Sequence, residues 1–218
     1  EEVSVARQLS ILITLALGLA VCGEPAHAAD EAAALARAET LVEAAHGALT
    51  SEGSDAERLG RLEAALEESF DFDIWERFLI DQHRELFTPE QLAEFRGLLP
   101  GFLADLYATQ FGKGLEAKPE IVEARRARKD VLVRAGIPRA DGRTLPVDWR
   151  IREADGEHRV IDVMVGGTSF LILKRDEFDG LIAQGGPARL LSFMRGRPSA
   201  RKGQGAPRRS AQLAQKRR

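Results

Sequence analysis

Four aspartates are the side chains of this sequence best suited to acid and base chemistry: Asp71, Asp73, Asp148 and Asp162. Two carboxyl groups that meet in one cavity can serve as general acid and general base. Asp71, however, follows Phe70 at the start of a short apolar helix, where it is expected to act as a helix cap. Asp162 falls in a predicted strand and is expected to point to solvent or to pair with Arg150. The sequence therefore predicts no catalytic residue.

The histidines and the cysteine do not form a metal-binding pattern. His83 and His158 each lack a second histidine at ligand spacing, and their charged neighbours are typical of exposed loops. The single Cys22 can form neither an internal disulfide nor a structural zinc site. The sequence also lacks His-Glu-x-x-His, Gly-x-Ser-x-Gly and P-loop motifs. We therefore expect no metal, no cofactor and no enzymatic activity.

Helices are predicted in the first half of the chain, where apolar side chains recur every three or four residues. They cover residues 30–52, 54–70, 74–79 and 88–107. Ser54 with Glu57, and Thr88 with Gln91, have the residue types of a capping box at two of the helix starts. Pro100 lies inside the last of these helices and predicts a kink about one turn before it.

Strands are predicted where the apolar period becomes two, at residues 121–127, 131–135, 147–152 and 160–165. Asp155-Gly156 is expected to join the last two strands as a hairpin, with Val147, Trp149 and Ile151 on one face. Helices followed by strands favour the α+β class. We expect N-terminal helices on a curved, mainly antiparallel sheet of about four strands, followed by C-terminal helices.

The last predicted strand leads directly into an amphipathic helix. Gly166 and Gly167 supply a turn, and Thr168 or Ser169 can accept hydrogen bonds from the first N–H groups of the helix. Apolar residues then follow helical spacing in a two-part helix over residues 169–194. The chain thus passes from a sheet to a helix over a few residues.

Two blocks of the sequence resemble the MlaC family, periplasmic phospholipid carriers also called toluene-tolerance auxiliary proteins. One block is this strand-to-helix junction, from Gly167 to Arg195. The other begins with Phe-Asp-Phe-Asp-Ile-Trp at residues 70–75, continues with Thr-Pro-Glu-Gln at residues 88–91 and ends at Leu106-Tyr107. The resemblance covers about residues 35–195, and the order of the motifs is more specific than any single motif.

The resemblance implies a carrier that holds the acyl chains of a phospholipid in an apolar cavity between the sheet and the helices. A lipid outside a bilayer exposes its chains at a cost of about 0.8 kcal/mol per CH₂, which only a deep apolar cavity can offset. The residues expected to line this cavity are aromatic or aliphatic: Trp75, Phe78, Leu79, Phe95, Phe102, Leu106, Tyr107, Trp149, Ile151, Val163, Val165, Phe170 and Leu173. The alternative for each of them is packing in an ordinary core.

The resemblance also implies protein partners, namely an outer-membrane lipoprotein complex and an inner-membrane ABC transporter with its substrate-binding ring component. The carrier would shuttle between them as a monomer, with transient membrane contact and without binding nucleic acid. Two alternatives stay open at this point. One is a carrier of a hopanoid or another isoprenoid lipid, and the other is a cone-shaped α+β enzyme whose cavity accepts a small apolar substrate.

The first residues indicate export. Residues 9–21 form an apolar run of about 13 residues, shorter than the ~20 that a membrane-spanning helix needs. Ala26-His27-Ala28 then matches the small-x-small pattern of a cleavage site, which predicts a signal peptide over residues 1–29 and a periplasmic mature protein. The 218-residue chain suits one domain, expected over residues 30–195.

The end of the chain is strongly basic. Residues 195–218 contain nine basic residues and no acidic one, whereas the whole chain has a formal net charge of −3. The composition of residues 196–218 cannot form a core, so we expect a disordered tail there. Such a tail is attracted to anionic bilayers, and the alternative is a solvated segment without a specific role.

Overall fold

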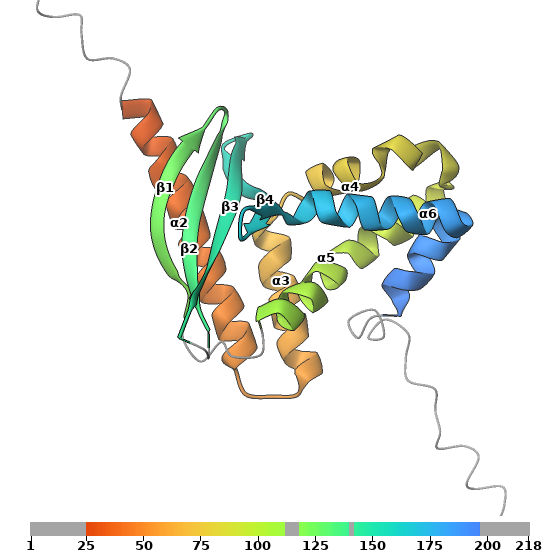
Figure 1. Ribbon diagram of the computed structural model, residues 1–218, viewed down its shortest axis with the longest axis horizontal. Coiled ribbons are helices and arrows are strands. Elements are labelled where there is room, and N and C mark those ends of the chain that lie inside the picture. The colour runs from red at the N-terminus through yellow and green to blue at the C-terminus, as the bar shows by residue number, and fades with distance from the viewer. Residues whose placement is uncertain (1–24, 112–117, 140–141, 197–218) are drawn as a thin grey trace, which may run out of the picture.

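The computed structural model describes residues 25–111, 118–139 and 142–196, which form helices packed against one antiparallel sheet (Figure 1). The helices are α2 (Pro25–Thr50), α3 (Asp55–Ser69), α4 (Phe72–Ile80), the 3₁₀-helix η1 (Asp81–Leu86), α5 (Pro89–Phe111) and α6 (Phe170–Arg195). The strands are β1 (Glu120–Ala127), β2 (Asp130–Pro138), β3 (Thr144–Ala154), β4 (Glu157–Val165) and the short β5 (Thr168–Ser169). The predicted α+β class is confirmed. The apolar run of the expected signal peptide, Cys22 and the tail from residue 197 lie outside the described residues.

Side-chain caps start the helices where the sequence predicts them. Ser54 Oγ accepts from the N–H of Glu57 at 3.3 Å, and the Glu57 carboxylate accepts from the N–H of Ser54 at 2.8 Å. Thr88 and Gln91 exchange the same two bonds at 3.3 and 3.0 Å. Asp71 caps α4 by accepting from the backbone N–H three residues later, at 2.8 Å. These bonds satisfy N–H groups that have no partner within their own helix.

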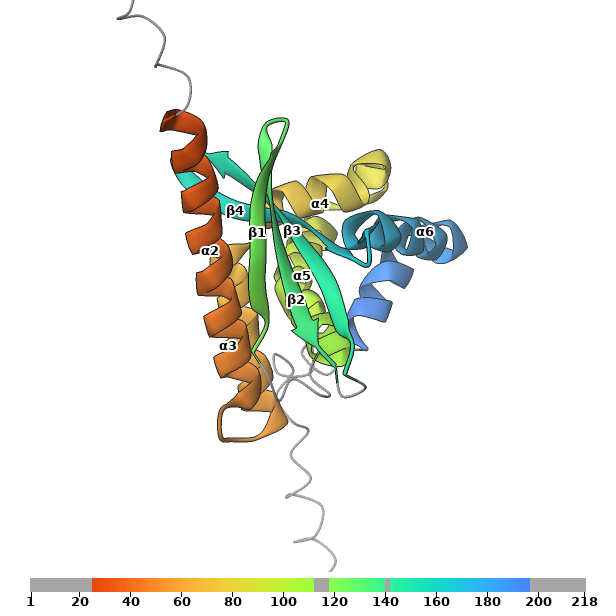
Figure 2. The ribbon, with the colours of Figure 1, turned by 60° about the vertical axis from the view of Figure 1, so that its left-hand side comes forward.

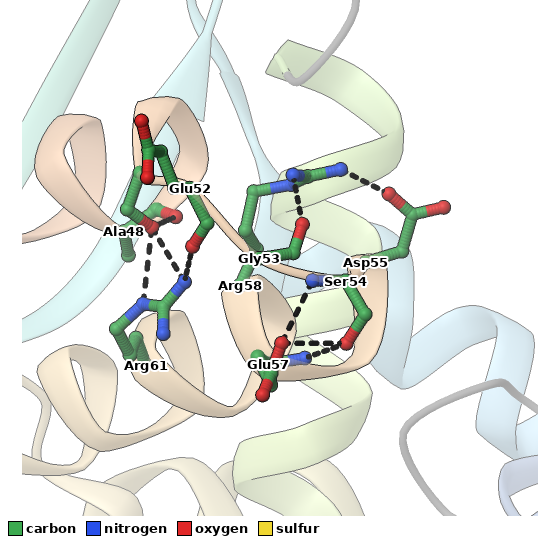
Figure 3. A network of polar contacts seen from close by, with 9 residues as sticks. Ala48, Glu52, Gly53, Ser54, Asp55, Glu57, Arg58 and Arg61 are labelled. Carbon is green, nitrogen blue, oxygen red and sulfur yellow. Dashed lines mark hydrogen bonds and ion pairs between the residues drawn. The ribbon is translucent and has the colours of Figure 1, made fainter.

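Two arginines of α3 hold the turn that connects it to α2 (Figure 3). Arg61 donates to Ser51 Oγ at 2.7 Å and to the carbonyl oxygen of Glu52 at 2.8 Å. Arg58 donates to the carbonyl oxygen of Gly53 at 2.6 Å. The turn carbonyls are therefore satisfied by side chains from the following helix, which fixes α2 and α3 as an antiparallel pair.

The sheet has the strand order β1-β2-β3-β4-β5, with antiparallel neighbours throughout. The predicted hairpin between β3 and β4 is confirmed, because Ala154 pairs with Glu157 and the two residues between them, Asp155 and Gly156, have φ angles of 55° and 82°. Positive φ at both positions is the geometry of a type I′ turn. Helix α2 contacts β1, β2, β3 and β4, so the sheet curves around it (Figures 1 and 2).

Asp30, near the start of α2, joins strands that are not neighbours in the sheet. Its carboxylate contacts Arg126 Nη1 of β1 at 2.6 Å and His158 Nε2 of β4 at 2.8 Å. Glu31 also accepts from the backbone N–H of Arg126 at 3.0 Å. One aspartate can reach both strands because the sheet is strongly curved. The expectation of an exposed loop for His158 is wrong, since this histidine lies in β4 and is half-buried.

The two faces of the sheet differ in chemistry. The face against the helices carries the fully buried Val147, Trp149 and Ile151 of β3, as predicted. On the other face, Arg134 donates to both carboxylate oxygens of Asp148 at 2.7 and 3.2 Å, and Arg152 does the same to Asp130 at 2.6 and 3.1 Å. These cross-strand pairs cover the two carboxylates, so Asp148 is buried and does not face a cavity.

Helices α5 and α6 each contain an internal proline, but only α6 is broken near it. Helix α5 continues through Pro100 as a single element, so the proline does not end it. Helix α6 has two parts, as predicted, because Gly185 and Gly186 adopt non-helical angles just before Pro187. None of the helices in the described ranges is both long and apolar enough to cross a membrane.

Gly186→Ala should destabilise the protein, because Gly186 has a φ of 65° and a ψ of −168°, a region that only glycine occupies readily. We expect a loss of about 1–3 kcal/mol in the free energy of unfolding. Gly180→Ala is the matched control within α6, since Gly180 is helical and neither glycine has a neighbour within 4 Å of an added Cβ. It should stabilise by up to ~1 kcal/mol. Urea unfolding of both variants measures the difference, and a Gly186→Ala protein as stable as Gly180→Ala would contradict the strain.

Candidate functional site

A cavity of about 340 Å³ lies between β4, α5 and the first turns of α6. Its lining is mostly apolar and consists of Phe70, Leu103, Leu106, Tyr107, Val163, Val165, Phe170, Leu173 and Lys174. This volume falls at the small end of the ~300–1,000 Å³ typical of ligand pockets. Leu173 lines the cavity and is also 51% exposed, so the first turns of α6 mark its opening. The arrangement is suited to an apolar ligand that enters beside α6.

An aromatic cluster forms the wall behind the cavity. Phe70 lies between α3 and α4, where Asp71 N–H donates to the carbonyl oxygen of Val160 in β4 at 3.0 Å. Its ring lies 5.7 Å from Trp75, which in turn lies 6.5 Å from Phe170. Trp75 is 1% exposed and packs behind the two lining rings. The cluster therefore ties α4 to both β4 and α6.

The structure divides the thirteen residues expected at the cavity into two groups. Six of them line it: Leu106, Tyr107, Val163, Val165, Phe170 and Leu173. The other seven are placed elsewhere: Trp75, Phe78, Leu79, Phe95, Phe102, Trp149 and Ile151. For these seven the expectation of a place in the cavity lining is corrected, because six are packed in the core and one lies at the surface.

The orientation of α5 about its axis explains why Phe95 and Phe102 do not line the cavity. Phe95 and Phe102 point toward α6, where their rings lie 6.0 and 5.4 Å from the ring of Phe178. The neighbouring stripe of Leu103, Leu106 and Tyr107 faces the cavity instead.

The positions of the remaining five residues in the fold explain why they do not line the cavity. Trp149 and Ile151 lie on β3, one strand further from α6, and are fully buried. Leu79 is buried in the core like Trp75. Phe78 is 38% exposed on α4 and lies under the guanidinium of Arg175, 5.0 Å from its ring centroid.

Three lining residues were not predicted from the sequence: Phe70, Leu103 and Lys174. Phe70 opens the Phe-Asp-Phe block, so the motif itself was a signal for it. Leu103 lies three residues before Leu106, and the i, i+3 rule would have placed both on one helix face. Lys174 lies one turn after Phe170, and its charge concealed its place in an apolar wall.

Asp162 organises the junction that carries three of the lining residues. Its carboxylate accepts from Ser169 Oγ at 2.7 Å and from the N–H of Leu171 at 3.2 Å, while Ser169 Oγ accepts from the N–H of Ile172 at 3.2 Å. The expectation that Asp162 points to solvent is wrong, since it is 8% exposed. It does lie opposite Arg150 in the strand register. Burial raises the pKa of this carboxyl, and its hydrogen bonds to Ser169, Leu171 and Val163 oppose that shift.

Two other hollows on the molecule have more charged and polar residues in their linings. One of about 1,020 Å³ lies between α2 and the start of β1 and is lined largely by charged or polar residues such as Glu39, Glu43 and Lys118. The second, of about 200 Å³, surrounds the buried Glu76, which accepts from Arg84 at 3.0 Å and from Arg96 Nη2 at 2.9 Å. The cavity between β4, α5 and α6 is the one whose lining is mostly apolar, so it is the candidate site for an acyl chain.

His83, like His158, pairs with an aspartate. His83 Nε2 lies 3.0 Å from Asp179 Oδ1 and is half-buried in η1, so the expectation of an exposed loop is wrong for it as well. The described part of the chain holds no cluster of three or more His, Cys, Asp or Glu side chains placed to bind a metal ion.

The comparisons with known proteins agree with this geometry. The family model of the MlaC protein matches residues 37–196, which is most of the chain. The chain belongs to the MlaC family. No curated protein has a matching sequence. A solved structure of a phospholipid-binding protein from Ralstonia solanacearum, in complex with a phospholipid, is similar to it with a TM-score of 0.63 and 18% identity. The match covers 77% of this chain and 96% of the Ralstonia chain.

MlaC membership confirms the resemblance that the sequence motifs indicated, and the family match contains all nine cavity-lining residues. The Ralstonia structure confirms the fold, because at this identity the agreement lies in the arrangement of helices and sheet. The MlaC domain of this chain is therefore an α+β fold with an apolar cavity between β4, α5 and α6.

Proposed function

We propose that this member of the MlaC family is a phospholipid carrier that holds acyl chains in the cavity between β4, α5 and α6. The observation that carries the proposal is the apolar lining, in which seven of nine residues are phenylalanine, leucine or valine. The similar Ralstonia protein, whose structure contains a phospholipid, supports the same ligand class. The protein acts by binding and release and makes no covalent change to the lipid.

The size of the cavity suggests how a two-chain lipid is accommodated. A phospholipid with two long chains is larger than the ligands that pockets of 300–1,000 Å³ usually hold. We propose that the cavity widens when lipid enters while Asp162 keeps the start of α6 on β4, and that the break at Gly185–Gly186 lets the rest of α6 adjust. The apolar surface of Leu173 at the opening would then contact the chain segments that extend outward.

We further propose a periplasmic location and the domain limits that the sequence predicts: a signal peptide over residues 1–29, the lipid-binding domain over 30–195 and a basic tail over 196–218. The carrier would exchange lipid as a monomer between an outer-membrane lipoprotein complex and an inner-membrane ABC transporter with its substrate-binding ring component. The tail would assist transient contact with anionic membranes.

The proposal is tested by the lipid content of the protein purified gently from cells. Organic extraction and mass spectrometry should find about one phospholipid per protein, and the empty protein should take up labelled phospholipid from vesicles. A protein that is empty and also fails to take up phospholipid would refute the carrier. Recovery of a hopanoid or another isoprenoid lipid instead would refute the proposed ligand class while keeping the carrier.

A further inference from the structure

Lys174 is the one charged side chain among the described residues that line the cavity. Its side chain is 17% exposed and its ammonium group pairs with the 35% exposed Glu177, so the ammonium group lies toward the opening. The ammonium lies 5.3 Å from the ring centroid of Phe170, which also lines the cavity. When the apolar part of a ligand is inside the cavity, its polar end remains at the opening. A positive charge at the opening is therefore placed to contact that polar end.

Glu177 partners this ammonium in the present structure. Lys174 Nζ lies 2.6 Å from Glu177 Oε2, one turn further along α6. The Lys174 side chain is 17% exposed and that of Glu177 is 35% exposed, so the carboxylate is the member of the pair that can turn into water. A carboxylate and a phosphodiester each carry one negative charge, and an ammonium group with three donors can bind either.

The other groups near the start of α6 that could bind an anion already have partners. The Leu171 N–H is taken by Asp162, and the Ile172 N–H is taken by Ser169. Of the other nearby charges, Arg175 lies over Phe78 and contacts Asp176 at 3.4 Å, away from the cavity lining. Among the described residues, Lys174 is therefore the cation best placed at this opening to attract a negative charge.

We propose that Lys174 binds the phosphodiester of the carried lipid and that Glu177 holds the lysine in place while the carrier is empty. On loading, the phosphate replaces the carboxylate as the partner of the ammonium. On release, Glu177 takes the lysine back, so the ammonium group has one negatively charged partner in both states. This inference rests on the proposed function and adds to it a preference for phosphorylated over neutral lipids with the same acyl chains.

The test is a competition between two lipids that have the same acyl chains, of which only one carries a phosphate in its head group. Empty full-length protein is mixed with vesicles that contain equal amounts of a phosphatidylglycerol and of the diacylglycerol with the same two chains, and the bound lipids are quantified by mass spectrometry. The wild type should enrich the phospholipid. Lys174→Met should lower the ratio of bound phospholipid to bound diacylglycerol about tenfold, as expected for the loss of a hydrogen-bonded ion pair. Lys174→Arg should restore most of the ratio, and Glu177→Gln should raise it.

Lys118→Met is the matched control, because Lys118 pairs with Glu43 on the surface near α2 and the variant has the same net charge as Lys174→Met. It should keep the wild-type ratio. Added inorganic phosphate should not displace the phospholipid, and displacement would instead assign Lys174 to free phosphate. An unchanged ratio in Lys174→Met, with lipid bound to both proteins, would overturn the role of Lys174 and leave the carrier intact. A wild type that takes up neither lipid would overturn both.

Discussion

Replacing Val163 with aspartate should reduce lipid loading to background. Val163 is 6% exposed and lines the cavity from β4. A carboxylate at this place would face acyl chains without a partner, and an unpaired buried charge costs at least several kcal/mol. Each 1.4 kcal/mol lowers the binding constant tenfold, so the expected loss exceeds a hundredfold. The measurement is the uptake of labelled phospholipid from vesicles.

Val122→Asp is the control for this variant. Val122 lies on β1 of the same sheet and is 66% exposed, so the same change there meets water and not a lipid. The Val122→Asp protein should load lipid like the wild type. Circular dichroism of both variants separates the loss of binding from a loss of folding. A folded Val163→Asp protein with normal uptake would remove β4 from the lipid site.

Replacing Asp162 with alanine should destabilise the fold and impair loading together. The change removes the carboxylate that accepts from the Ser169 hydroxyl and from the N–H groups of Leu171 and Val163. An unsatisfied buried donor costs about 1–3 kcal/mol, so two of them cost on the order of 2–6 kcal/mol out of the ~5–15 kcal/mol by which most domains are stable. Urea unfolding measures this loss. The start of α6 should also lose its fixed position, which lowers the uptake of lipid.

Asp162→Asn is the companion variant, because an amide can keep these contacts but cannot ionise. Burial raises the folded-state pKa of Asp162 above its ordinary value of 3.8. Between the two values the folded state binds more protons than the unfolded state, so the free energy of unfolding contributed by this group rises as the pH falls. The stability of the wild type minus that of Asp162→Asn should therefore increase as the pH is lowered through that window. Parallel pH profiles would show that Asp162 does not titrate in this way.

The sequence contains local signals that predict much of the fold. The capping residues, the Asp155-Gly156 turn and the alternation in β3 depend on neighbours within a few positions, and all three are found in the structure. The two-part form of α6 follows equally from its Gly-Gly-Pro sequence. These features required no knowledge of the tertiary arrangement.

The composition of the cavity wall depends on tertiary arrangement, and there the sequence is ambiguous. Phe102 and Leu103 are adjacent apolar residues, and only the rotation of α5 against α6 decides that the second faces the cavity. The strand pattern predicts that Asp162 faces solvent. In the structure, the chain folds back after β4 and brings Ser169 and Leu171 to its carboxylate. Lys174 follows Phe170 at helical spacing, but as a charged residue it is not expected in an apolar lining until the cavity beside it is known.

The contacts of Asp30 have a consequence for the order in which the chain can fold. Its partners Arg126 and His158 lie 96 and 128 residues further along the sequence. Contacts between such distant residues slow folding, because a long loop must close before any of them is gained. A chain that emerges N-terminus first therefore cannot complete the packing of α2 on the sheet until β4 has also emerged. For a protein exported across a membrane as we propose, α2 therefore gains its last contacts with the sheet only near the end of delivery.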